Sequence, residues 1–170
     1  MHKTIASLSL CLFAPSCVVA FGNQGDIGNV LEAHDARREL QAAVDELNVA
    51  YESGEVREAF LNSIEDSGDV IVIGSLAEEW TVGIESIRDA MAESEGESTY
   101  VGRRLHDSTL QISTRGDVGW LVERMDLIYD VDGEETALEG FRATSVWQRD
   151  DGKWRMVHFH GSMPDAVNEI

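Results

Sequence analysis

Cysteine, proline and positive charge are all scarce in this chain of 170 residues. Its two cysteines, Cys11 and Cys17, lie within the first 20 residues, so the remainder offers no disulfide, thiol nucleophile or cysteine metal ligand. The formal net charge is −19, from 13 lysines and arginines against 32 aspartates and glutamates. A surface of this charge repels nucleic-acid phosphates and anionic lipid head groups. We therefore expect neither nucleic acid nor a membrane surface as a partner.

The first 20 residues have the pattern of a secretory signal peptide. The short positive start MHKT precedes the apolar run IASLSLCLFAPSCVVA, which is too short for a comfortable membrane anchor. We expect cleavage after Ala20 and a secreted or periplasmic product. Cys17 offers an alternative as a lipoprotein cleavage site, although the proline two residues before it is atypical there. Residues 21–170 are long enough to form one domain with its own core.

Hydrophobic periodicity divides the mature chain into a helical N-terminal part and a C-terminal part of strands. We expect three helices, over residues 26–53, 55–64 and 78–94, the last beginning with the loop-like WTVG. We expect five strands, over residues 70–75, 101–112, 117–131, 137–149 and 153–160. Asp-Gly pairs in two of the predicted turns favour tight hairpins. This order predicts an α+β domain in which the helices pack on one face of a curved antiparallel sheet.

Glu123 is the first candidate functional residue, because strand alternation places it on one side with Leu121 and Met125. A carboxylate on an apolar side is costly to bury unless it is paired or protonated. Glu123 is therefore a candidate general base or ligand contact. Alternatively, this side faces solvent, or Glu123 forms a structural ion pair with Arg103 or Arg142.

His158 and His160 lie two residues apart in the last predicted strand, within WRMVHFHGS. Strict alternation would place both rings on one side with Trp154 and Met156. Zinc needs at least three protein ligands, and no third ligand accompanies this pair, so we expect no metal and no other cofactor. The two rings are then either hydrogen-bonded core groups or groups that line a pocket.

Arg142 lies in the preceding predicted strand, and its neighbours depend on the hairpin register. A three-residue turn would place Arg142 opposite His160 and form a polar cluster able to hold an anion. A two-residue turn would place Ala143 there instead and form no such cluster. The sequence leaves both registers open. Trp80, which follows two glutamates, is either a core residue or the wall of a pocket mouth.

The order of these elements resembles the nuclear transport factor 2-like superfamily, in particular its SnoaL-like members and the association domain of calcium/calmodulin-dependent protein kinase II. The similar stretches are AYESGE (50–55), EEWTVGIESIRDAM (78–91) and FRATSVWQRDDGKWRMVHFHGSMP (141–164). The resemblance covers essentially the whole mature chain and implies a cone of curved sheet, a cystatin-like roll, closed by helices. Two arginines of the kinase domain's cationic pocket would fall at Ser145 and Gly161, which weakens any claim to that anion site.

The leader predicts export, and the resemblance suggests a domain that binds a small apolar or weakly acidic molecule in its cone, without a recognisable catalytic set. We expect a homodimer formed through the sheet, or a higher homo-oligomer. The candidate ligand-binding residues are Trp80, Glu123, Arg142, His158 and His160. One alternative is an acid–base enzyme similar to ketosteroid isomerases or polyketide cyclases, with Glu123, His158 or His160 moving protons. A second alternative is an oligomerisation module whose cone is filled by side chains.

Overall fold

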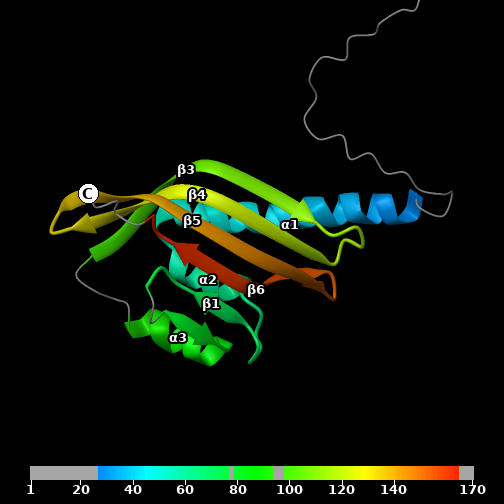
Figure 1. The fold of residues 1–170 in the computed structure, drawn as a ribbon, viewed down its shortest axis with the longest axis horizontal. Helices are drawn as coiled ribbons and strands as arrows, with labels where there is room; N and C mark the ends of the chain where they lie inside the picture. The colour runs from blue at the N-terminus through cyan, green and yellow to red at the C-terminus, as the bar shows by residue number, and fades with distance from the viewer. Residues whose placement is uncertain (1–26, 77–78, 94–97, 165–170) are drawn as a thin grey trace, which may run out of the picture.

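The computed structural model describes residues 27–76, 79–93 and 98–164 (Figure 1). The predicted leader, residues 1–20, lies outside the described residues. The helices are α1 (Ile27–Ser53), α2 (Val56–Ser63) and α3 (Ile84–Glu93). The strands are β1 (Ile71–Ile73), β2 (Trp80–Val82), β3 (Ser98–Ile112), β4 (Val118–Val131), β5 (Glu134–Asp150) and β6 (Lys153–Ser162).

The strands form one six-stranded sheet in the order β2-β1-β6-β5-β4-β3. Neighbouring strands are antiparallel except for β1 and β6, which run parallel. Figure 1 shows α1 lying along one face of the long, bent strands β3 to β5. We call this the inner face and the opposite side the outer face. The predicted α+β class, with three helices and a curved sheet, is confirmed, but the sheet is mixed and not wholly antiparallel because β1 runs parallel to β6.

The core fills the space between α1 and the inner face. Ala36, Leu40, Val44 and Leu47 recur every three or four residues along α1 and are all buried. They belong to one apolar cluster with buried side chains of the sheet, among them Leu121, Trp147, Trp154 and Met156. This amphipathic spacing is what fixes α1 across the sheet.

Strand β2 corrects the predicted start of the third helix. Trp80 lies opposite Ile73 and Val82 opposite Ile71, so the WTV stretch extends the sheet by one short strand. The chain then turns at Gly83, whose φ of 84° favours glycine, and α3 begins at the next residue. Three residues are too few for a period to appear in the sequence, which is why a loop was expected there.

Both Asp-Gly pairs form the predicted tight hairpins. Asp132 and Gly133 join β4 to β5, with φ of 55° and 86°. Asp151 and Gly152 join β5 to β6, with φ of 45° and 74°. Positive φ at both central residues is the requirement of a type I′ turn, whose twist matches that of the flanking strands.

The last hairpin keeps a two-residue turn but does not keep a constant register. From Asp150 opposite Lys153 to Trp147 opposite Met156, the strands pair as this turn dictates. The pairing then shifts by one residue at Val157, which has no Cα partner on β5 and forms a β-bulge.

This bulge turns the two histidines to the outer face. His158 lies opposite Val146, and His160 lies opposite Thr144. One extra residue in a strand exchanges the faces of all the side chains that follow it. The expectation that both rings share a side with the preceding tryptophan and methionine is therefore wrong. Neither register considered for Arg142 holds, since it lies opposite Ser162.

Candidate functional site

A small hollow lies between α1 and the inner face of the sheet. Its volume is about 20 Å³, which is room for one water molecule. It is lined by Leu47, Tyr51, Leu121, Glu123, Met125, Phe141, Ala143, Ser145, Met156 and Phe159. Ligand pockets usually measure about 300–1,000 Å³, so side chains fill most of this cone, as the oligomerisation alternative expects. Any molecule larger than water must displace some of them.

Glu123 is the ionisable carboxyl group of the hollow. It lies on β4 and shares the inner face with Leu121 and Met125, as strand alternation predicts. Only 8% of the residue is exposed. Burial raises the pKa of its carboxyl group, while the charge of Arg103 and hydrogen bonds from Arg103 and Ser108 act in the opposite direction. The carboxyl group thus holds a proton more tightly than an exposed glutamate does.

Arg103, on β3, is the ionic partner of Glu123. Its Nη1 lies 3.4 Å from Glu123 Oε1, and its side chain is only 2% exposed. The predicted ion pair with Arg103 is confirmed, and the alternative of a solvated face is wrong. A fully buried pair such as this is costly to desolvate and contributes little net stability.

Two residues of α1 hold the guanidinium from the other side. Nη2 of Arg103 donates a hydrogen bond to Asn48 Oδ1 at 2.5 Å. The guanidinium carbon lies 4.8 Å from the ring centroid of Tyr51, a cation–π contact. Nη1 also lies 3.7 Å from the sulfur of Met125, another lining residue. The Arg103 guanidinium therefore contacts three residues that line the hollow without being a lining residue itself.

Three tyrosines continue the site from the hollow toward the surface. The rings of Tyr51 and Tyr100 meet edge-on with centroids 6.1 Å apart, and those of Tyr100 and Tyr129 with centroids 5.6 Å apart. The hydroxyl of Tyr100 donates to the backbone oxygen of Tyr51 at 2.8 Å. Burial raises the pKa of all three phenols, so they stay protonated at neutral pH.

The other four sequence candidates lie on the outer face, away from the hollow. Trp80 is 63% exposed at the β2 edge of the sheet. Arg142 is exposed and donates from Nη2 to the backbone oxygen of Met163 at 3.1 Å. His160 is exposed, and the pKa of the half-buried His158 is lowered by burial and by its neighbour His160. Glu123 alone of the five candidates lines the hollow.

Asp126 is a buried carboxylate that sequence reasoning missed. It accepts hydrogen bonds from the backbone nitrogen of Gly140 at 3.0 Å and from Arg104 Nη1 at 3.2 Å, and its Oδ2 lies 2.9 Å from His106 Nε2. The hydrogen bond from Gly140, followed by that from His106, lowers the pKa of the carboxyl group. Gly140 has a φ of 75° and lies where the β4–β5 register shifts. Asp126 therefore holds an irregular part of the sheet together, and no periodic signal in the sequence marks this role.

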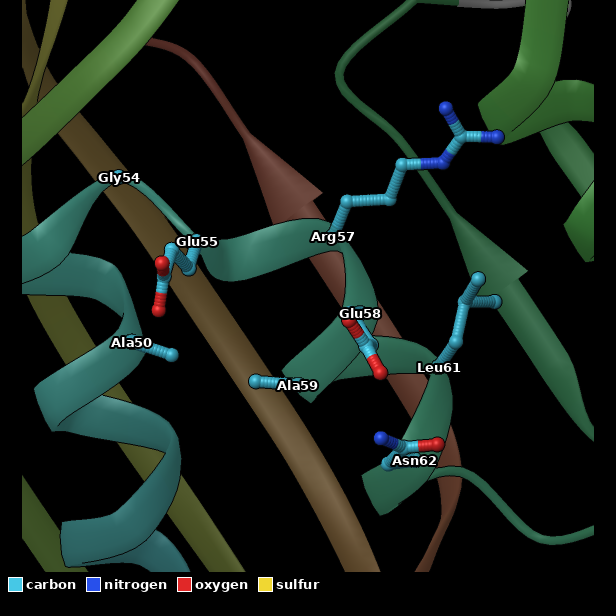
Figure 2. A pocket seen from close by; sticks show the side chains of 8 residues that line it. All are labelled: Ala50, Gly54, Glu55, Arg57, Glu58, Ala59, Leu61 and Asn62. Atoms are coloured by element: carbon cyan, nitrogen blue, oxygen red, sulfur yellow. The ribbon is translucent and has the colours of Figure 1, made fainter.

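A wider surface groove lies at the turn between α1 and α2 (Figure 2). Its volume is about 600 Å³, and it shares no lining residue with the hollow. Figure 2 shows Ala50 and Ala59 pointing toward one another from the two helices. The groove is lined by Ala50, Gly54, Glu55, Arg57, Glu58, Ala59, Leu61 and Asn62.

Across residues 27–76, 79–93 and 98–164, no group of three or more histidine, cysteine, aspartate or glutamate side chains could hold a metal ion. In that same part of the chain, no helix is both long enough and apolar enough to cross a bilayer.

Comparisons with known proteins agree with this architecture. The family model described as the SnoaL-like domain matches residues 40–166. A proposed dehydratase of the NTF2-like family from Streptomyces avermitilis has a TM-score of 0.63 at 16% identity, over 79% of this chain and 99% of that one. A nuclear transport factor 2 (NTF2-like) superfamily protein from Salmonella enterica has a TM-score of 0.61 at 15% identity, over 81% and 98% of the two chains. A proposed ketosteroid isomerase from Parabacteroides distasonis gives 0.54 at 16% identity, over 76% and 88%. At these identities the similarity shows the fold alone, and no curated protein matches the chain.

Proposed function

Since the chain belongs to the SnoaL-like domain family of the NTF2-like superfamily, we propose that it binds a small, largely apolar molecule with one weakly acidic group inside its cone. A single observation carries this proposal: Glu123, only 8% exposed, lines a hollow whose walls are otherwise mostly apolar. Burying a charge in an apolar interior costs free energy when the protein folds. Its presence in an apolar interior therefore supports a functional role.

Flexible side chains could make room for such a ligand. Met125 and Met156 both line the hollow, and methionine has three rotatable bonds and adapts to irregular spaces at small cost. A starting volume of about 20 Å³ favours a compact molecule over a polycyclic one. A weakly acidic hydroxyl group on that molecule would donate a hydrogen bond to the carboxylate of Glu123.

A thermal-shift screen with matched probes tests this proposal. Phenol and toluene have nearly the same shape, but only phenol offers a hydroxyl donor. We expect phenol to raise the melting temperature of the mature chain in a saturable way, and by more than toluene does. Glu123→Gln should remove that preference, whereas Glu58→Gln, an exposed change on α2, should keep it. The absence of any shift with either probe, together with no small molecule retained in native mass spectrometry, would overturn the proposal.

Acid–base catalysis is a second candidate function, favoured by the raised pKa of the Glu123 carboxyl group. A buried carboxylate with a raised pKa is a stronger base than an exposed one. Proton abstraction next to a carbonyl group is the reaction class that we propose for such a buried base; two of the similar structures are named as a proposed ketosteroid isomerase and a proposed dehydratase. Deuterium exchange into enolisable ketones, followed by NMR, tests this. Exchange that Glu123→Gln abolishes supports catalysis, and exchange equal to that of the buffer excludes it for those ketones.

We also propose that the chain is exported and that residues 1–20 are removed. The pattern of the apolar run and the absence of later cysteines support this. Intact-mass analysis of the exported protein should give a chain that begins at Phe21. A lipid-modified chain that begins at Cys17 would favour the lipoprotein alternative, and an uncleaved chain retained inside the cell would contradict both.

A homodimer formed through the outer face is the proposed assembly. This face carries exposed apolar side chains, including Trp80, Val82 and Val122. Burying apolar surface contributes about 25 cal/mol per Å². Val122→Glu should convert a dimer to a monomer in light scattering, whereas Val49→Glu, on an exposed position of α1, should not. A wild-type monomer at high concentration would contradict the assembly.

A further inference from the structure

Arg103 is held by two residues of α1 in addition to its ionic partner on β4. Its hydrogen bond to Asn48 Oδ1 measures 2.5 Å, and its guanidinium packs over the ring of Tyr51. Asn48 and Tyr51 are three residues apart and so lie on the same side of α1. The contact with Glu123 measures 3.4 Å, which is longer than a usual charge-assisted hydrogen bond. The helix therefore fixes the cation, and the carboxylate meets a charge that is already in place.

The hydrogen bonding of Arg103 is incomplete for a purely structural pair. Its Nε is buried and has no hydrogen-bond partner within the described part of the chain. Buried polar atoms in folded proteins are nearly always satisfied, and an exception calls for an explanation. An apolar pair of similar volume would have filled this space at equal or better stability. This supports a role for the charge itself.

We propose that Arg103 is a positioning residue: anchored by Asn48 and Tyr51, it holds the Glu123 carboxylate ionised at the wall of the hollow, so that the ligand must present a hydrogen-bond donor. This inference rests on the proposed binding function for its ligand class. An ionised carboxylate accepts hydrogen bonds and donates none. A hydroxyl or enol group is then favoured, and a ligand carboxylate is repelled as a like charge in a poorly solvated site.

Arg103 and Ser108, which lower the pKa of Glu123, both belong to β3. Tyr51 on α1 feels the charge of Glu123, and Tyr129 on β4 in turn acts on Tyr51. Both phenols have raised pKa values and stay neutral, so they do not oppose the carboxylate at neutral pH. Burial raises the pKa of Glu123, and Arg103 lowers it. Without Arg103, only the hydrogen bond donated by Ser108 opposes the rise in the Glu123 pKa that burial causes.

Titration of Glu123 in the unliganded mature chain tests this role. The carboxyl carbons of glutamate are labelled with ¹³C and followed by NMR, and Glu123→Gln identifies the signal. Arg103→Gln should raise the titration midpoint of Glu123 by at least about one pH unit, a tenfold change in proton affinity. Asn48→Ala keeps the charge but removes one anchor, so a smaller rise is expected. Arg104→Gln is the matched control, since that neighbour is 63% exposed and pairs with Asp126; it should leave the midpoint unchanged.

Each outcome decides the proposal. An unchanged midpoint in Arg103→Gln overturns it, and an unchanged midpoint in Asn48→Ala overturns the anchoring by α1. If Arg103→Gln does not fold, Arg103→Lys serves in its place: it keeps the cation without the planar fork. If the titration midpoint of Glu123 in Arg103→Lys is unchanged, as it is in the Arg104→Gln control, the role of the guanidinium geometry is refuted. Because the titration uses no ligand, a failed probe screen would remove the binding function without altering the titration result. A failed titration test would likewise leave the result of the probe screen unaltered.

Discussion

Replacing Arg103 with methionine should destabilise the protein strongly at neutral pH and far less in acid. The change leaves Glu123, which is 8% exposed, charged and unpaired beside an apolar hollow. Breaking a buried ion pair from one side costs about 3–5 kcal/mol. In a domain of about 150 residues, 1 kcal/mol corresponds to roughly 2–4 °C in melting temperature. The expected fall is therefore roughly 6–20 °C.

The pH dependence of this loss follows from the carboxyl group. Burial raises the pKa of Glu123 in the folded state above its unfolded value, which is about 4.3. The native state then binds the proton more tightly than the unfolded state does. The stability linked to this group is complete below the unfolded pKa and is lost as the pH rises through the folded pKa. Removing Arg103 raises the folded pKa further, so the loss becomes larger and extends to higher pH.

Urea denaturation at several pH values measures the effect, with the buried Trp147 and Trp154 as fluorescent reporters. The double variant Arg103→Met/Glu123→Leu should recover most of the stability at neutral pH, because an apolar pair replaces the buried charges. Two results would refute the reasoning. One is an Arg103→Met protein as stable as the wild type at pH 7. The other is a loss of equal size at pH 4 and pH 7.

Three further changes test the fold. The Gly140 N–H lowers the pKa of the Asp126 carboxyl group, so the stability that this group contributes is present at neutral pH and is lost as the pH falls through that pKa. Asp126→Asn should therefore flatten the acid side of the stability profile in thermal melts between pH 3 and 7. Leu40→Ala, in the core, should cost about 2–5 kcal/mol in urea denaturation, whereas Val49→Ala, 66% exposed on the same helix, should change stability by less than about 0.5 kcal/mol. Gly119→Ala forces a methyl group against Leu40 and should cost about 1–3 kcal/mol, part of which Leu40→Ala restores.

The main architecture could be predicted because it depends on regular periods. Alternation predicted the four long strands β3 to β6, and apolar residues at helical spacing predicted α1 to α3. The Asp-Gly pairs fixed both final hairpins through their positive φ. The parallel pairing of β1 with β6 could not be predicted, since it depends on how the helices return the chain to the sheet.

The bulge at Val157 could not be predicted from WRMVHFHGS, because no glycine or proline lies at Val157 or next to it. Its cause lies in packing. The ring of Phe159 meets that of Phe60 edge-on in the core, with centroids 5.3 Å apart. Unbroken alternation would have pointed Phe159 outward and both histidines into the apolar interior. Burying the phenylalanine gains more than burying two imidazoles.

The candidate site was predictable in its strand residues and not beyond them. Alternation placed Glu123 on the apolar side of β4, and Arg103 was one of two possible partners. The roles of Asn48 and Tyr51 could not be predicted, because these residues are 55 and 52 positions from Arg103 in the sequence. Only the crossing of α1 over the sheet brings them together. Contacts between a helix and a sheet have no signature in local spacing.

The bulge also separates two groups of titratable side chains. His158 and His160 face outward, where they can affect assembly, while Glu123 and Arg103 remain at the hollow. The pKa of His158 is lowered by burial and by His160, so its charge changes below the usual histidine range. A pH effect on binding that disappears in Glu123→Gln but persists in His158→Ala belongs to the hollow. A pH effect on assembly that disappears in His158→Ala but persists in Glu123→Gln belongs to the outer face. Ligand binding and assembly can therefore be tested independently in one protein.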